Sequence, residues 1–471
     1  MLNPLLNPFD VLPLIKSSIL DPDRLKRFSP DRLKRYQDKS LRKMVKYAYR
    51  VPLYHDKYKK VGLHPSDIKS VDDIYKLPMI SKDDLRTYYP DGLIPKGYNK
   101  EKVHVICTGG TTGKSVSLFT EFLNIGQAGQ LQIREMSPFG LNWRSSRNAH
   151  IGNLNECRVD QVVMDHFLRH MGKFFSIDNR VDIDVSTPIR EIVDHLNSFK
   201  PEVIFTYPAI FQQLAFQKRK GLGENIKPKV LYCGGSVLDK YTRVYVEDAF
   251  GCPLLNTYRS VEANGIIASE CKHHTWHIHS DFYIVEAVDD NLEPVKEGEN
   301  GHIVLTRIFG RGTPIIRYTG IDDWIKIQNN FDCECGLKTP VLVDGIKGRK
   351  KGAIVLPNGK VFPPGAFCFI EPVLTNHKTF KVKQYQVIQK KVHEIEILLV
   401  IDENLRDIGV SVDTIKKEIK ERYRVKTGPN VRITVREVDK IEHLGDASKP
   451  VPIVVSHVKP EEALKYIDGG S

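Results

Sequence analysis

A glycine- and threonine-rich loop between Cys107 and Ser115 holds the residue types that most narrow the chemistry of this chain. Glycine lets backbone N–H groups surround an anion, hydroxyl groups add donors, and Lys114 adds a positive charge. This composition predicts a phosphate site, with an ordinary glycine-rich hairpin as the alternative. The candidate phosphate-binding residues are Thr108, Gly109, Gly110, Thr111, Thr112, Gly113 and Lys114.

The residues that flank this loop argue against a Walker nucleotide-binding loop. That motif needs a glycine five residues before its Gly-Lys pair and a helix that begins at the lysine. Thr108 stands where that glycine is required. Residues 116–120 alternate apolar and polar side chains, and residues 103–106 also show a strand pattern. The loop is therefore expected to join two strands, which argues against a P-loop kinase or GTPase.

Composition describes a soluble globular protein with a positive charge. The 471 residues suggest about two to four domains, and the hydrophobic content is 41% with a mean hydropathy of −0.32. The net charge of +12 favours contact with anions such as nucleotides, coenzyme A or anionic surfaces. A lysine-rich solvated face is the alternative. No run of like charges with interleaved aromatic residues marks a nucleic-acid site, so no nucleic-acid partner is expected.

The sequence predicts neither a secreted nor a membrane-spanning protein. The most apolar N-terminal stretch, residues 11–20, is interrupted by Pro13 and Lys16 and lacks a basic leading region. The 8 cysteines are scattered, unlike those of a small disulfide-stapled domain. We therefore expect a cytoplasmic location.

Hydrophobic periodicity predicts an α/β protein. Residues 30–100 are helical and charged, and strand-like and helical runs alternate between residues 103 and 343. The last part has strands near 386–388, 395–400 and 431–435, with a helix at 412–422 that Ser411 caps. The expected parts are an N-terminal helical segment of the large domain (1–100), the core of that domain with mixed sheets (101–347) and a small α+β domain (348–471).

Four further segments fall in the order seen in adenylate-forming enzymes. The run from Tyr258 to Glu262 resembles their Tyr-Gly-x-Thr-Glu element, and residues 313–322 are similar to their Pro-x-x-Arg-Tyr-x-x-Gly-Asp segment. Residues 348–350 resemble the Gly-Arg hinge, and residues 447–450 resemble the C-terminal Gly-Lys loop. Residues 48–54 and 77–85 look like the branch that contains phenylacetate–coenzyme A ligases, coenzyme F390 synthetases and CapK proteins. The resemblance spans nearly the whole chain and implies a mobile small domain.

The resemblance assigns a role to each candidate residue. Transfer of AMP from ATP to a carboxylate brings two anions together, so cations must offset their repulsion. The resemblance implies that residues 108–114 hold the phosphates of ATP and that Glu262 binds Mg²⁺. Asp322 would accept hydrogen bonds from the ribose hydroxyls, and Tyr258 would stack on adenine beside Gly235. Arg349 would contact the nucleotide near the hinge, and Lys449 would bridge the carboxylate and the α-phosphate. The alternatives are a surface acid for Glu262, a turn residue for Asp322 and a solvated side chain for Lys449.

This chain departs from the family pattern at several positions. The usual Gly-Gly-Glu near adenine is replaced by a Gly-Gly pair that precedes Ser236, and Ile321 separates the glycine from Asp322. The Lys449 loop carries Ala-Ser before the lysine. No glycine-rich substrate stretch of the phenylacetate-ligase type follows Gln130, which argues against phenylacetate itself as the acid.

Cysteine and histidine residues predict a structural zinc site. Cys-x-Cys occurs at Cys333 and Cys335, and a Cys-Lys-His-His-Thr-Trp-His-Ile-His run begins at Cys271. Thiolates and imidazoles are the ligands of closed tetrahedral zinc sites. The resemblance to ligases of this branch favours Cys271, His277, Cys333 and Cys335, with His273, His274 and His279 as rival fourth ligands. Free thiols and surface histidines in a polar loop are the alternative.

Taken together, the motifs predict an ATP- and Mg²⁺-dependent ligase that forms an acyl- or aryl-adenylate from a small carboxylic acid. The acyl group would then pass to a thiol such as coenzyme A. Two other functions stay open: transfer of AMP to a hydroxyl group, as in F390 synthetases, and a non-catalytic role in polysaccharide or envelope assembly, as for CapK. A homodimer is left open as the assembly.

Overall fold

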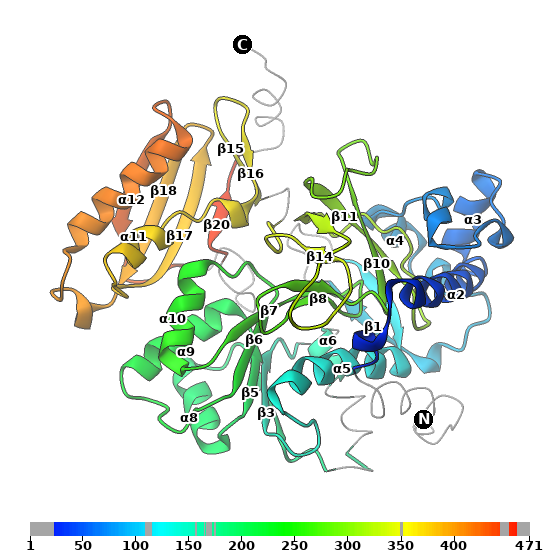
Figure 1. Ribbon diagram of the computed structural model, residues 1–471, viewed down its shortest axis with the longest axis horizontal. Helices are drawn as coiled ribbons and strands as arrows, with labels where there is room; N and C mark the ends of the chain where they lie inside the picture. The colour runs from blue at the N-terminus through cyan, green and yellow to red at the C-terminus, as the bar shows by residue number, and fades with distance from the viewer. Residues whose placement is uncertain are drawn as a thin grey trace. The chain divides into compact units, whose positions relative to one another are not determined.

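The computed structural model describes residues 23–108, 115–155, 158–163, 165, 172–173, 176–348, 352–442 and 452–458. The chain divides into two compact units (Figure 1). Unit 1 comprises Met1–Asp184 and Leu255–Gly345, and unit 2 comprises Val185–Leu254 and Ile346–Ser471. Among the helices of the described residues, none combines the length and apolar composition that a membrane span needs.

Unit 1 begins with the charged helices that the sequence predicts. In α2 (Pro30–Ala48), Ser29 accepts a hydrogen bond from the backbone N–H of Arg32 at 3.3 Å, which caps the first turn. Leu41 and Val45 are fully buried on one face, and the cations occupy the opposite face. The other helices of unit 1 are α3 (Pro52–Lys60), α4 (Lys82–Tyr88), α5 (Phe122–Met136) and α6 (Val159–Val162).

The sheets of unit 1 combine parallel and antiparallel strands. β1 (Val103–Cys107) and β2 (Ser117–Glu121) form an antiparallel pair, and β3 (Asn148–Gly152) runs parallel to β4 (Arg180–Asp184). An antiparallel series follows the order β7 (Leu254–Ser260), β8 (Gly265–Glu270), β9 (Trp276–Ile278), β14 (Val341–Leu342) and β13 (Ile327–Gln328). A separate three-stranded sheet has the order β10 (Tyr283–Val288), β11 (Gly301–Arg307) and β12 (Trp324–Ile325).

Unit 2 contains a parallel strand pair and the small C-terminal sheet. β5 (Val203–Thr206) runs parallel to β6 (Val230–Gly234), and both strands are buried along their whole length. The helices are α8 (Ile189–Phe199), α9 (Pro208–Arg219), α10 (Lys240–Phe250), α11 (Glu371–Asn376) and α12 (Val412–Thr427). The remaining strands are β15 (Ile354–Val355), β16 (Val361–Phe362), β17 (Val382–Lys391), β18 (Glu394–Ile401), β19 (Arg432–Glu437) and β20 (Val454–Ser456).

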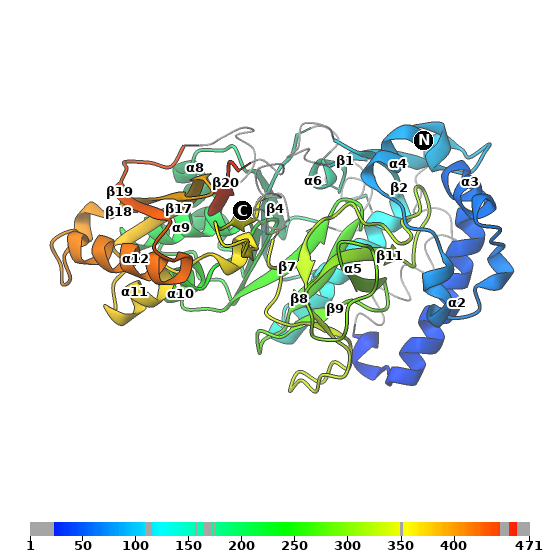
Figure 2. The ribbon, with the colours of Figure 1, turned by 90° about the horizontal axis from the view of Figure 1, so that it is seen from above.

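The C-terminal sheet has the order β19-β18-β17-β20, in which only the β17–β18 pair is antiparallel. Helix α12 covers one face of this sheet (Figures 1 and 2). Ser411 caps the helix as predicted, and Ile415, Ile419 and Tyr423 are buried at helical spacing. The α/β class and the small α+β part at the C-terminus are therefore confirmed.

Candidate functional site

The β1–β2 hairpin positions the first residue of the candidate phosphate loop. The backbone N–H of Thr108 donates to the carbonyl oxygen of Val116 at 2.9 Å, and the N–H of Val116 donates to the Thr108 hydroxyl at 2.9 Å. These two bonds close the neck of the loop, so the predicted strand–loop–strand arrangement is present. Cys107, the last residue of β1, is disulfide-bonded. Gly109 to Lys114 lie outside the described residues.

Strand β2 connects this hairpin to the two other predicted nucleotide segments. The side-chain amide of Asn264, in the same turn as Glu262, donates to the Thr120 hydroxyl at 2.6 Å. At the preceding residue of β2, the backbone N–H of Phe119 donates to the Thr313 hydroxyl at 3.0 Å. The N–H of Thr313 donates back to the Phe119 carbonyl oxygen at 2.9 Å. Three motifs that are far apart in the sequence therefore converge on one strand.

Glu262 lies in the turn between β7 and β8 and is 6% exposed. The hydroxyl of Tyr318 donates to Oε1 of Glu262 at 2.9 Å, which fixes the orientation of the carboxylate. Tyr318 itself is held by backbone hydrogen bonds in both directions with Leu305 of β11. A Cβ atom on Gly320 would lie 2.3 Å from the Tyr318 hydroxyl, so only glycine fits there. The buried carboxylate is a suitable oxygen ligand for a hard cation.

A second carboxylate, which the sequence analysis did not select, contacts Tyr258. The Tyr258 hydroxyl donates to Oδ2 of Asp323 at 2.8 Å, and both side chains are 7% exposed. The preceding residue, Asp322, has a φ of +63°, a left-handed conformation that aspartate tolerates better than most residues. In the sequence, the two consecutive acidic residues after Ile321 were the feature that could have indicated a second buried carboxylate near Tyr258. The predicted contact between Asp322 and the ribose hydroxyls remains a proposal.

Arg317 is a buried positioning residue that the motif analysis left without a role. Its guanidinium donates to both carboxylate oxygens of Glu286, at 3.0 and 3.2 Å, and to the carbonyl oxygens of Leu77 and Tyr75, at 2.9 and 3.1 Å. These bonds attach the segment before α4 to the sheet that contains β10. Such a bidentate charged contact favours one geometry for the backbone that carries Tyr318.

Gly235 is the remaining predicted nucleotide residue that the structure describes. Gly235 follows β6 in unit 2 and has a φ of +78°, and a Cβ atom there would lie 2.8 Å from the ring of Tyr207. Glycine is thus required by both conformation and space. Arg349 and Lys449 lie outside the described residues.

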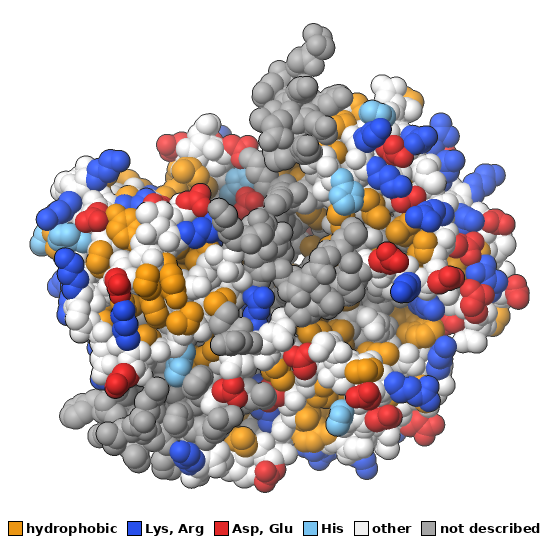
Figure 3. Space-filling model, turned by 180° about the vertical axis from the view of Figure 1, so that it is seen from behind, with side chains coloured by type: hydrophobic (Ala, Val, Ile, Leu, Met, Phe, Trp, Pro, Cys, Tyr) orange, Lys and Arg blue, Asp and Glu red, His pale blue; other side chains and the backbone are white. Residues whose placement is uncertain are grey.

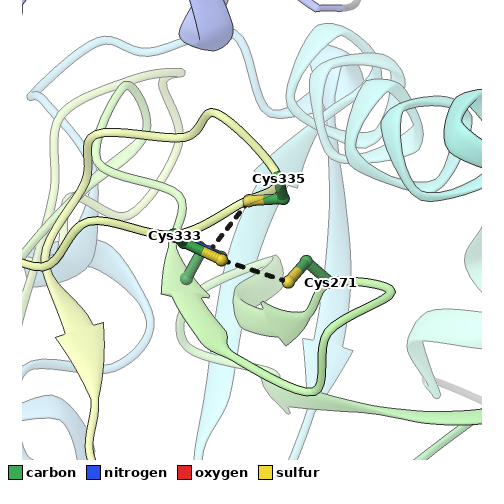
Figure 4. Close-up of side chains that lie close together, drawn as sticks. Cys271, Cys333 and Cys335 are labelled. Atoms are coloured by element: carbon green, nitrogen blue, oxygen red, sulfur yellow. Dashed lines mark hydrogen bonds between the residues drawn. The ribbon is translucent and has the colours of Figure 1, made fainter.

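Three cysteines of unit 1, Cys271, Cys333 and Cys335, lie close together (Figure 4), and His277 belongs to the same group. The ligand atoms of Cys271, His277, Cys333 and Cys335 all lie within 4.8 Å of one another. The sulfur atoms of Cys271 and Cys333 are 3.7 Å apart, and Nε2 of His277 is 3.2 Å from the sulfur of Cys335. Two sulfurs on a tetrahedral zinc ion lie about 3.8 Å apart when each Zn–S bond is about 2.3 Å. The Cys271–Cys333 distance therefore matches two ligands of one zinc ion.

The surroundings of the cluster support metal binding. Nδ1 of His277 is 3.2 Å from the hydroxyl of Thr339, a contact that fixes the imidazole and leaves Nε2 toward the sulfurs. Hydrogen bonds from Cys335 and His277 lower the pKa of the Cys271 thiol, and the same contact with Cys271 raises the pKa of the Cys335 thiol. A thiolate is the form of cysteine that binds zinc.

The structure separates His277 from its three rivals. His273 lies 3.5 Å from Glu334 and His274 lies 3.7 Å from Glu270. His279 is buried and contacts Ser269 and Arg134. His277 is the histidine grouped with the cysteines in the part of the chain that the structure describes.

Comparison with known proteins identifies relatives along most of the chain. No protein-family model matches. Phenylacetate-coenzyme A ligase of Thermus thermophilus is 26% identical over 422 residues, which is 85% of this chain and 90% of that enzyme. Protein CapK of Staphylococcus aureus is 24% identical over 401 residues, covering 82% of this chain and 81% of CapK.

A solved structure shows the same fold. The crystal structure of 2-hydroxyisobutyryl-CoA ligase in the postadenylation state, in complex with an acyl-AMP, has a TM-score of 0.74 and is 18% identical, covering 92% of this chain and 90% of that one. The same enzyme has also been solved with acyl-AMP and CoA, with a TM-score of 0.61. By sequence over most of its length and by fold, the chain is therefore related to the adenylate-forming CoA ligase superfamily, in its phenylacetate–CoA ligase and CapK-like branch.

Proposed function

We propose that this protein is an ATP-dependent ligase that activates a carboxylic acid as an acyl- or aryl-adenylate and passes the acyl group to a thiol, CoA. The observation that carries the proposal is the convergence of three nucleotide motifs on β2. The neck of the phosphate loop, the turn of Glu262 and the segment of Thr313 are joined there by hydrogen bonds. The names of the relatives and the acyl-AMP and CoA complexes of the enzyme with the same fold support it.

In the proposed adenylation step, the carboxylate of the acid attacks the α-phosphorus of ATP and pyrophosphate leaves. Residues 108–114 would hold the β- and γ-phosphates, and Lys449 would offset the repulsion between the carboxylate and the α-phosphate. Tyr258 would stack on adenine near Gly235, and Asp322 would accept hydrogen bonds from the ribose hydroxyls. Mg²⁺ bound by Glu262 would neutralise phosphate charge.

In the proposed second step, the thiolate of CoA attacks the acyl carbon and AMP leaves. The small domain, residues 348–471, would move about the hinge near Arg349 between the two steps. This movement would let one acyl-adenylate site serve two different reactions. Four protein ligands would leave no open position on the zinc ion, so its proposed role is structural.

Glu262→Gln is expected to raise the Mg²⁺ concentration needed for half-maximal pyrophosphate release by about tenfold. A neutral amide oxygen is a poorer ligand for a hard cation, and a tenfold change corresponds to about 1.4 kcal/mol. A magnesium titration of initial rates measures this shift. An unchanged titration would remove Glu262 from the metal shell.

Tyr318→Phe is expected to lower the rate of pyrophosphate release about tenfold and to shift the magnesium titration in the same direction. The substitution removes the 2.9 Å hydrogen bond that orients Glu262, and a hydrogen bond to a charged group contributes roughly 1.5–3 kcal/mol.

Tyr283→Phe is the matched control for that variant. It also removes a buried hydroxyl, but this hydroxyl donates to the carbonyl oxygen of Ala263 at 3.2 Å instead of to the carboxylate. We expect its magnesium titration to match that of the parent. Equal shifts in both variants would show that Tyr318 acts through general packing.

A pyrophosphate-release screen over a library of carboxylic acids, with and without CoA, tests the proposed function. Acid-dependent pyrophosphate release with thioester formation is the expected result. A stable AMP–substrate adduct without thioester would favour transfer of AMP to a hydroxyl group. An ATP-dependent thermal shift without pyrophosphate release from any acid would favour a non-catalytic protein.

A further inference from the structure

The positive charge of the chain is concentrated in a short segment that the proposed ligase chemistry does not use. Residues 30–69 contain 12 Lys and Arg but only 4 Asp and Glu, a net charge of +8 out of +12 for the chain. Arg35, Lys39, Arg42 and Lys46 are all exposed and recur at intervals of three or four residues along α2. They therefore form one stripe on the solvent face of the helix.

Figure 3 shows Lys and Arg side chains along its left edge, on the side of the N-terminal helices. The face of α2 opposite the stripe packs into unit 1 through Leu41 and Val45, which are fully buried. Packing of the apolar face thus fixes the direction in which the cations point. The net charge of +12 favours contact with anions, and the stripe places part of that charge on one face of α2.

The stripe ends at a pocket of about 650 Å³ between α2 and the short helix Pro65–Asp67. Arg42 and Lys46 line it from α2, and Lys69 lines it from the other side. Tyr49 and His64 add two rings whose centroids are 5.6 Å apart. The volume falls within the range of small-molecule sites.

Among the residues that the structure describes, no acidic side chain lines this pocket. The nearby carboxylate of Asp67 accepts the backbone N–H of His64 at 2.8 Å and serves as a helix cap. Arg42 donates to the carbonyl oxygen of Lys69, which ties the two walls together without neutralising either charge. Three like charges in one pocket repel one another unless an anion joins them.

We propose that this pocket binds the phosphate group of a phosphorylated ligand. Arg42 would hold two phosphate oxygens with its planar guanidinium, while Lys46 and Lys69 would act as point charges. His64 and Tyr49 would contact the group that carries the phosphate. The phosphate comes from a soluble phosphomonoester or from a lipid headgroup, since both offer the same dianion. The pocket residues, from Arg42 to Lys69, are distinct from the phosphate loop at 108–114. The phosphorylated ligand is therefore proposed in addition to the ATP of the proposed ligase.

The double variant Arg42→Gln/Lys46→Gln tests the pocket against a control of equal charge. Lys59→Gln/Lys60→Gln removes two exposed cations of the same basic segment that do not line the pocket. Binding of glycerol 3-phosphate is measured by calorimetry, with glycerol as the uncharged reference. Co-sedimentation with phosphatidylcholine vesicles that contain phosphatidic acid is the second arm, with pure phosphatidylcholine as its reference.

We expect the pocket variant to weaken binding at least tenfold in one arm, while the control stays within twofold of the parent. Loss in the glycerol 3-phosphate arm identifies a soluble ligand, and loss in the vesicle arm alone identifies a lipid headgroup. Equal weakening in both variants would show diffuse attraction and overturn the pocket. Absence of binding by the parent in both arms would also overturn it. Melting temperatures equal to that of the parent establish that the exposed substitutions leave the fold intact.

Discussion

Lys449→Ala is expected to lower the rate of pyrophosphate release by roughly a hundredfold or more while ATP binding is kept. By resemblance, this lysine contacts the attacking carboxylate and the α-phosphate, two anions whose repulsion grows as the new bond forms. A charge contact that is made mainly in the transition state contributes about 3 kcal/mol or more, which is roughly a hundredfold in rate. A continuous pyrophosphate assay measures the rate, and calorimetry measures ATP affinity.

Lys440→Ala is the matched control for this prediction. Lys440 is an exposed lysine nine positions earlier in the chain, so the variant loses the same charge from the same region. It should release pyrophosphate like the parent. Residues 443–450 lie outside the described residues, and the assignment of Lys449 therefore depends on its motif. Parental activity in Lys449→Ala would refute that assignment directly.

Local elements were predictable because the pattern that defines them is local. Strand β5 occupies residues 203–206, within the stretch where alternating strands and helices were predicted, and Ser411 caps α12 as predicted through a 3.1 Å hydrogen bond from the N–H of Thr414. In each case a short apolar run or a capping residue decides the outcome without distant partners. The same holds for the strands on either side of the phosphate loop, which overlap the predicted ranges.

Contacts between distant segments could not be read from the sequence. The Tyr318 hydroxyl reaches Glu262 across 56 positions, and the Tyr258 hydroxyl reaches Asp323 across 65. The motif named Asp322, yet the backbone geometry turns its neighbour toward the tyrosine. Asp322 itself has a left-handed φ of +63°, and its predicted ribose contact stays a prediction.

The predicted zinc ligands were likewise only partly predictable from the sequence. Cysteine spacing suggested the site, but four histidines within seven residues left the fourth ligand open. The register of β8 and β9 decides the matter, because it pairs His277 with Ser269, two residues before Cys271. His279 instead reaches the buried side chains of Arg134 and Ser269.

Cys335→Ser is expected to abolish zinc binding and to lower the melting temperature by roughly 5 °C or more. The parent should contain about one zinc ion per chain by plasma mass spectrometry. In the parent, the ion would join Cys271 to Cys333, 62 positions apart, and thereby hold the loop after β13 against the turn after β8. Loss of this link removes folding free energy, because a closed structural site forms only in the folded chain.

Cys252→Ser is the control for this prediction, since Cys252 is a free cysteine outside the four-residue group. It should keep both the zinc and the melting temperature of the parent. Parent protein that is free of metal and melts like Cys335→Ser would show that the cysteines are ordinary thiols. The ion should take no direct part in adenylation, because its four protein ligands leave no position for substrate. The loop of Cys333 follows Asp323 by ten residues, however, so loss of zinc should weaken nucleotide binding through that segment.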